Sequence, residues 1–119
     1  MAFARLNGIV QHFQDAGARD GQAIVFSNSL GTDFRIWDDL IRHLPAGFRV
    51  IRYDKRGHGL SEATQGPYSM VTLAEDLAAL LDHLGVTHAA VVGLSVGGMI
   101  AQGLAALRPD LVSALVLMD

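Results

Sequence analysis

The 119-residue sequence contains no cysteine, which excludes a disulfide framework, a cysteine-ligated zinc site and a thiol nucleophile. It also lacks an excess of basic residues, because 9 Lys and Arg stand against 12 Asp and Glu and the net charge is -3. Binding to a phosphate backbone needs clustered Lys and Arg, so nucleic acid is not an expected partner. Half of the residues are hydrophobic and 18% are charged, which predicts one compact globular domain over residues 1–119.

The sequence also has no evident signal peptide or membrane-spanning segment. The N-terminal residues MAFARLNG have no apolar run of the signal-peptide kind, so we expect a cytoplasmic chain. The stretch Ala89–Leu107 is uncharged and long enough to cross a bilayer, but Gly93, Gly97 and Gly98 interrupt it. Its pattern also changes from a β-branched run to a helical period. We interpret it as a strand, a tight turn and a buried helix, with no membrane span.

The sequence gives no sign of a metal or cofactor site, and none is expected. A zinc site needs three or four convergent ligands, whereas His83 and His88 on either side of Gly85 offer at most two. The glycine-rich run at Gly93–Gly98 fits neither nucleotide motif. Ser95 occupies the second glycine position of a dinucleotide fingerprint, and no lysine follows the last glycine as in a phosphate-binding loop.

Strand-like and helix-like segments alternate along the chain without internal repeats or linkers. Because the central strands are apolar on both faces, they predict an α/β fold with a mostly parallel sheet of about six strands and helices on both faces. The leucines between Leu73 and Leu84 recur on one face of a helix. Ser69 or Thr72 is a candidate N-cap for this helix, and Gly85 marks its C-terminal end. The expected elements are a hairpin over 3–14 with an Asn7-Gly8 turn, strands at 23–27, 49–53, 89–94 and 114–118, and helices near 36–44, through 73–84 and over 96–107.

The chemistry concentrates in a G-x-S-x-G run, Gly93–Gly97, between a predicted strand and a predicted helix. A serine on so sharp a turn adopts a strained backbone, and side chains two residues before and after it would collide with the strand and the helix. Glycine at both positions avoids these collisions. The turn places Ser95 at a helix N-terminus, where free backbone N–H groups favour developing negative charge. The alternative is an ordinary glycine-rich turn without chemistry.

Four blocks together resemble a known family. They are Phe26–Asp33 (FSNSLGTD), Trp37-Asp38, Tyr53–Ser61 (YDKRGHGLS) and Gly93–Gly98 (GLSVGG). In wording, spacing and order they are similar to the α/β-hydrolase family and, within it, to the 3-oxoadipate enol-lactonases. The resemblance covers the whole chain but only the N-terminal half of that family's single domain, without its cap and its last strands.

The resemblance implies roles for individual residues. Ser95 matches the nucleophile that attacks the lactone carbonyl, and Gly93 and Gly97 match the flanking glycines of the nucleophile elbow. The backbone N–H groups of Leu30 and Val96 match the oxyanion hole. Many relatives carry His-Gly in the oxyanion loop where this chain has Asn28-Ser29.

The acid and base of a catalytic triad are not expected within these residues. In this family the order is Ser, acid, His, and a serine hydroxyl is weakly nucleophilic without them. Some members place the acid where Asp119 lies, although a structural residue at a strand end is the usual interpretation. We expect none of the five histidines to act as the base, because all precede Ser95 on predicted surface or loop positions: His12, His43, His58, His83 and His88.

The sequence therefore predicts a hydrolase that is active only with a second polypeptide, which supplies the cap, two strands, Asp and His. The resemblance implies opening of the lactone ring of 3-oxoadipate enol-lactone during aromatic-acid degradation. A related carboxylesterase or perhydrolase, and a non-catalytic hydrolase-fold fragment, are the alternatives. A final strand at 114–118 without a neighbour would be a bare apolar edge, which supports the second polypeptide.

Overall fold

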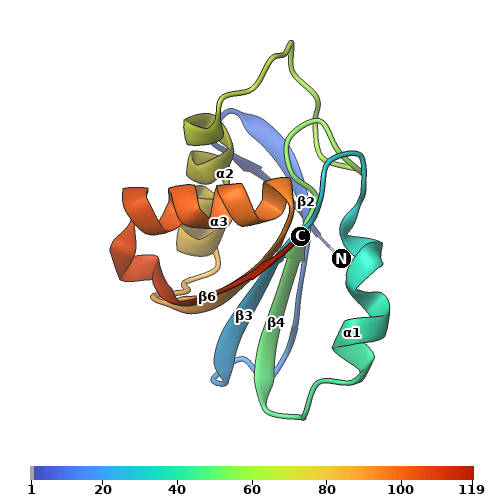
Figure 1. Ribbon diagram of the computed structural model, residues 1–119, viewed down its shortest axis with the longest axis vertical. Helices are drawn as coiled ribbons and strands as arrows, with labels where there is room; N and C mark the ends of the chain where they lie inside the picture. Colours follow the sequence, from blue (N-terminus) through green and yellow to red (C-terminus); the bar gives the residue numbers. More distant parts are fainter. Residues whose placement is uncertain (1) are drawn as a thin grey trace.

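The computed structural model describes residues 2–119, which form one six-stranded sheet with helices on both faces (Figure 1). The strands are β1 (Ala2–Leu6), β2 (Ile9–Gly17), β3 (Gln22–Ser27), β4 (Phe48–Tyr53), β5 (Ala89–Leu94) and β6 (Val112–Met118). The helices are α1 (Asp38–Arg42), α2 (Met70–His83) and α3 (Val96–Leu107), with 3-10 turns η1 (Phe34–Trp37) and η2 (Pro109–Leu111). The predicted α/β class is confirmed.

The order of the strands in the sheet is β1-β2-β4-β3-β5-β6. The β1–β2 hairpin pairs antiparallel with itself and with β4, whereas β4, β3, β5 and β6 run parallel to one another. The carboxyl ends of these four strands therefore meet at one edge of the sheet. This is the edge at which ligands bind in open α/β sheets.

Alternate residues of the parallel strands face two separate apolar cores. Val25, Ile51 and Val91 point to the face covered by α2 and α3, where they join a large cluster with the leucines of α2. Ile24 and Val50, one residue earlier on their strands, contact the smaller cluster under η1 and α1. This two-sided burial explains why the central strands carry apolar residues on both of their faces. It also explains why both faces carry helices, as Figure 1 shows.

Helix α2 begins and ends at the residues that its sequence predicts. Ser69, not Thr72, is the N-cap, and its side chain accepts a hydrogen bond from the Thr72 amide. Gly85 follows the C-terminus with φ 71°, the left-handed conformation expected of a glycine after a helix. Leu73, together with the rest of the apolar stripe, lies in the larger core.

The helix predicted at 36–44 is wrong in its bounds. The Asp33 side chain accepts a hydrogen bond from the Arg35 amide, so the chain turns already at Phe34 and makes the 3-10 turn η1. Only one α-helical turn, α1, follows before Pro45, whose ring disfavours helical geometry in the preceding residue. The hairpin and the last strand are longer than predicted, at 2–17 and 112–118.

The uncharged stretch 89–107 consists of β5, one tight turn and α3, as predicted. Among residues 2–119 no helix has the length and apolar character needed to cross a membrane.

A buried ion pair joins the loop after β4 to α2. The Asp76 carboxylate on α2 is fully buried, and Arg56 donates to both of its oxygens at 2.8 and 2.9 Å. The Asn7 side chain from the hairpin turn donates to the same carboxylate at 2.7 Å. These hydrogen bonds raise the pKa of the Arg56 guanidinium above its ordinary value. Asp76 thus connects three segments that lie far apart in the sequence.

Removing this carboxylate is expected to destabilise the fold. Asp76→Ala leaves the partly buried Arg56 guanidinium and the Asn7 side chain without their carboxylate, and the loss of one partner from a buried pair costs about 3–5 kcal/mol. The matched control is Asp82→Ala, on the same helix, because Asp82 also pairs with an arginine, Arg108, but at the surface. Urea unfolding followed by circular dichroism measures both variants. Equal midpoints for the two would contradict the assignment.

Candidate active site

Ser95 occupies a tight turn between β5 and α3 and is exposed at the carboxyl edge of the sheet. Its backbone has φ 55° and ψ -117°, a conformation that L-residues with side chains rarely adopt. The turn is fixed on both sides: the Ser95 amide donates to the Met118 carbonyl of β6 at 2.8 Å, and the Ser95 carbonyl accepts from Gly98 at 2.9 Å. A strained backbone conformation persists only when the surrounding structure holds it in place, as these two hydrogen bonds do here.

The glycines on either side of Ser95 allow the strand and the helix to approach closely. A Cβ atom on Gly93 would lie 2.5 Å from Gly98 Cα and 2.6 Å from the Gly97 carbonyl oxygen. A Cβ atom on Gly97 would overlap the Ser27 carbonyl and lie 2.8 Å from the Asn28 carbonyl oxygen. The first turn of α3 therefore packs directly against the end of β3 and the start of the loop that follows it.

That loop, residues 28–33, is held by its own polar side chains. The Asn28 side-chain amide donates to the Thr32 carbonyl at 2.9 Å, and the Thr32 hydroxyl donates to the Ser29 carbonyl at 2.8 Å. Among the described residues, no acceptor bonds the backbone amide of Leu30, nor that of Val96 at the start of α3. Both amides are thus available to a ligand, and the contact at Gly97 keeps their two segments together.

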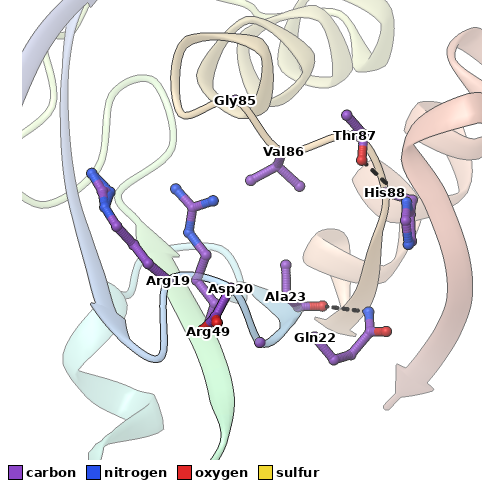
Figure 2. A pocket seen from close by; sticks show the side chains of 10 residues that line it. Arg19, Asp20, Gln22, Ala23, Arg49, Gly85, Val86, Thr87 and His88 are labelled. Carbon is purple, nitrogen blue, oxygen red and sulfur yellow. Dashed lines mark hydrogen bonds between the residues drawn. The ribbon is translucent and has the colours of Figure 1, made fainter.

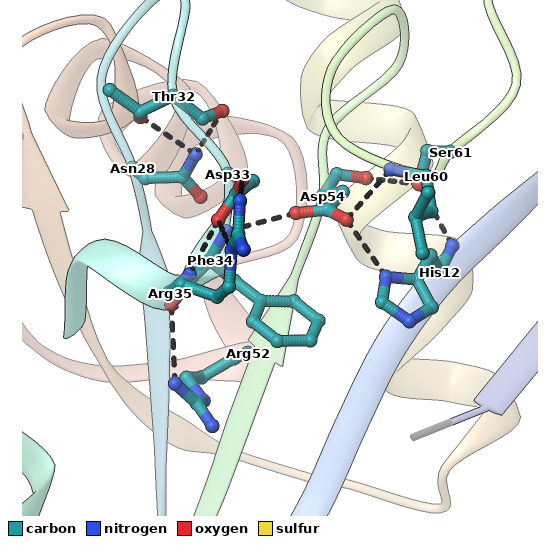
Figure 3. A network of polar contacts seen from close by, with 10 residues as sticks. All are labelled: His12, Asn28, Thr32, Asp33, Phe34, Arg35, Arg52, Asp54, Leu60 and Ser61. Atoms are coloured by element: carbon teal, nitrogen blue, oxygen red, sulfur yellow. Dashed lines mark hydrogen bonds and ion pairs between the residues drawn. The ribbon is translucent and has the colours of Figure 1, made fainter. Parts of the chain in front are cut away.

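Asp54, directly after β4, organises the other side of this loop (Figure 3). Its buried carboxylate accepts hydrogen bonds from the Phe34 amide at 2.9 Å and the Leu60 amide at 3.0 Å. The second carboxylate oxygen lies 2.8 Å from Nδ1 of His12, which stacks on the Phe34 ring with centroids 5.0 Å apart. The expectation that His12 lies at a surface or loop position is wrong. It is a buried residue of β2, because the carboxylate beyond β4 supplies its polar partner.

Lys55 is a residue of this region that sequence reasoning missed. Its side chain is 3% exposed, and its Nζ donates to the Ser29 carbonyl at 2.6 Å and to the Asn28 carbonyl at 3.2 Å. Burial lowers the pKa of the Lys55 amine to about 8, although the neighbouring Asp54 carboxylate acts in the opposite direction. The signal in the sequence was weak: a lysine inside an otherwise recognisable loop motif.

With this geometry in place, the comparison with known proteins is direct. The family model of the alpha/beta hydrolase fold matches residues 22–119. The chain belongs to the alpha/beta hydrolase fold family. The chain is 40% identical over 102 residues to 3-oxoadipate enol-lactonase 2 of Acinetobacter baylyi, a match that covers 86% of this chain and 38% of that protein.

Other members of the family give the same picture. The crystal structure of an enol-lactonase from Burkholderia xenovorans matches with a TM-score of 0.91 and 41% identity, over 96% of this chain and 45% of that one. A bifunctional esterase/perhydrolase of Acinetobacter calcoaceticus is 37% identical over 93 residues, which cover 77% of this chain and 34% of that protein. The chain spans less than half the length of each of these relatives.

Among residues 2–119, no histidine is bonded to the Ser95 side chain. No hydrogen bond joins the Ser95 hydroxyl to any of the described residues. His58 bonds the Arg56 carbonyl within its own loop, and His12 is held by Asp54. Three histidines are exposed elsewhere: His43, His83 and His88.

Asp119 lies close to the elbow through the backbone. It follows Met118, whose carbonyl accepts the Ser95 amide, so the end of β6 and the turn of Ser95 are neighbours. Its side chain is exposed and bonds no histidine of the described chain. The geometry leaves its suggested role as the acid a prediction.

A separate hollow of about 350 Å³ lies at the opposite, amino end of the sheet (Figure 2). Arg19, Arg49 and His88 line it, but the Arg49 guanidinium is already paired with Asp15 at 2.6 and 2.9 Å. The hollow lies at the opposite ends of the strands from Ser95 and does not include it. Within residues 2–119 no three His, Asp or Glu side chains cluster as metal ligands.

The close packing at Gly97 gives a specific prediction. Gly97→Ala inserts a Cβ atom into the Ser27 and Asn28 backbone, so we expect a destabilisation of about 3 kcal/mol. The matched control is Gly103→Ala in the same helix, where the nearest atom would be Ala74 Cβ at 3.4 Å and the gain in helix propensity is about 0.5–1 kcal/mol. Thermal and urea unfolding measure both. Similar stability of the two variants would show that the elbow is less tightly packed.

Proposed function

We propose that this chain carries the nucleophile and the oxyanion hole of a serine hydrolase that opens an enol-lactone ring. The observation that carries the proposal is the strained turn of Ser95 at the start of α3. The hydroxyl there would attack the lactone carbonyl carbon, the ring oxygen would leave, and water would then hydrolyse the acyl-serine. Gly93 and Gly97 form the nucleophile elbow that makes this turn possible.

The oxyanion hole in this proposal consists of the Leu30 and Val96 amides. Both lack a protein acceptor among the described residues, and Val96 stands at the positive end of α3. Donors aimed at the developing charge contribute roughly 3 kcal/mol each in other hydrolases. Leu30 itself is 73% exposed, so this part of the loop lies at the surface.

We further propose that a second polypeptide supplies the catalytic acid and histidine. Two observations support this. The Ser95 hydroxyl has no base among the described residues. In addition, β6 is an edge strand whose apolar side chains are 38–49% exposed, from Leu115 to Met118. An exposed apolar edge of this length favours pairing with another strand.

The proposed substrate is 3-oxoadipate enol-lactone, within the degradation of aromatic acids. The identity to two Acinetobacter baylyi enol-lactonases, 40% and 41%, supports it. A carboxylester or peracid substrate is the second candidate, because the esterase/perhydrolase relative is nearly as similar. The cytoplasmic location and the absence of nucleic-acid and membrane partners stay predictions from the sequence.

The first experiment is an intact-mass measurement of the purified protein under native and denaturing conditions. We expect a second polypeptide of comparable size beside the 12.7 kDa chain, and hydrolysis of the enol-lactone by the complex. A panel of p-nitrophenyl esters and a peracid assay on the same material distinguish the two candidate substrates. Faster turnover of an ester or peracid than of the enol-lactone would favour the second candidate. If only this chain is found and it hydrolyses nothing, the alternative of a non-catalytic hydrolase-fold fragment is correct.

Replacing the serine tests the mechanism itself. In the active complex, Ser95→Ala is expected to lower kcat by a factor on the order of 10⁴ or more, because the acyl-serine no longer forms. A fluorophosphonate probe should label the parent and not the variant. Thr87→Ala is the control, since Thr87 is an exposed hydroxyl residue before the amino end of β5. Full activity in Ser95→Ala would refute the assignment.

A further inference from the structure

We propose that Lys55 is a positioning residue of the oxyanion hole, because its buried ammonium group holds the Ser29 carbonyl and thereby directs the Leu30 N–H. This inference rests on the proposed function in assigning the Leu30 amide to the oxyanion, but the positioning itself is a property of the loop. Lys55 is the one lysine of the sequence.

The argument starts from the geometry of one peptide bond. The Ser29 C=O and the Leu30 N–H belong to the same planar trans peptide unit, so they point in opposite directions. Lys55 Nζ donates to the Ser29 oxygen at 2.6 Å, and the Thr32 hydroxyl donates to it at 2.8 Å. With the oxygen fixed on the buried side, the N–H is directed away from Lys55. This is the side on which no described residue accepts it.

The same amine connects the loop to the elbow. Lys55 Nζ also donates to the Asn28 carbonyl at 3.2 Å, and that carbonyl oxygen lies 2.8 Å from where a Cβ on Gly97 would be. Asn28 is therefore confined between Lys55 and the first turn of α3. The two proposed oxyanion donors, on the loop and on the helix, keep their relative position through this contact.

The positive charge has a second effect on the peptide. A cation at the carbonyl oxygen polarises the peptide unit and makes its N–H a stronger donor, as in other chains of hydrogen bonds. The charged group that acts on the amine is Asp54, the preceding residue, whose carboxylate is engaged by the Phe34 and Leu60 amides and by His12. The other contacts of the amine are the two backbone carbonyls.

The test measures the loop directly by NMR, in the protein as purified with any polypeptide that accompanies it. Lysine-selective labelling gives one side-chain signal, and its titration is followed together with the Leu30 amide. In the parent we expect both to titrate with the same midpoint, near the pKa of about 8 that burial gives Lys55. A Leu30 amide shift that does not follow the lysine would overturn the proposal without any mutation.

Two variants and a control separate positioning from packing. In Lys55→Met the backbone order parameter at Leu30 should fall from about 0.85 to below about 0.6, while α2 stays rigid. Lys55→Arg keeps a charge, so the loop should stay ordered and show no titration near pH 8. Arg35→Met is the control, because this exposed cation near the loop bonds Asp33 and not Ser29. An ordered loop in Lys55→Met would refute positioning.

Activity of the complete enzyme gives an independent readout. Because the oxyanion forms only in the transition state, Lys55→Met should lower kcat about 10- to 100-fold with little change in KM, and Lys55→Arg should restore most of it. Loss of loop order in an inactive protein would support the role of Lys55 and refute the proposed function. Hydrolysis with an unchanged kcat in Lys55→Met would support the function and refute the role of Lys55.

Discussion

The close contact between the first turn of α3 and the carboxyl end of β3 determines the geometry of the whole site. Gly97 lies against the Ser27 and Asn28 backbone, and Gly93 lies against Gly98, with no room for a side chain at either glycine. The strained turn of Ser95 and the loop after β3 are therefore two sides of one packing contact. A methyl group added at either glycine would push α3 away from β3 and separate the turn from the loop, because a packed interior has no space for the added volume.

The loop itself needs polar partners, because a backbone near the protein interior must satisfy its N–H and C=O groups. Two successive residues after β4, Asp54 and Lys55, supply these partners, one as an acceptor and the other as a donor. Asp54 accepts from the Phe34 and Leu60 amides, whereas Lys55 donates to carbonyls at the start of the loop. The ends of the loop are thus held by neighbouring residues with opposite charges. Substituting Lys55 removes the donor to the two carbonyls, whereas substituting Asp54 removes the acceptor of the two amides and the partner of His12.

Local patterns were sufficient for most of the fold. The apolar stripe of α2, its Ser69 cap and Gly85 depend on neighbours within one or two turns, and the structure has them as predicted. The α/β class and the family were accessible through the alternation of elements and the spacing of motifs, but the order of the strands in the sheet was not predicted. The burial of His12 and Lys55 could not be predicted, because their hydrogen-bond partners lie 42 and 26–27 residues away in the sequence. Hydrophobic periodicity does not indicate such distant contacts. The start of the 3-10 turn η1 at Phe34 was not predicted either, because its N-cap, Asp33, lies before the predicted helix.

One hydrogen bond connects the open edge of the sheet to the strained turn of Ser95. The Ser95 amide donates to the Met118 carbonyl, the last position of the exposed strand β6. A strand that pairs with β6 would fix the position of that carbonyl, and with it the backbone of the serine. Under the proposed function, a strand that covers the apolar edge would therefore order the backbone of Ser95, and the same partner would bring a base to its hydroxyl. Completion of the sheet and activation of the serine would then be a single event.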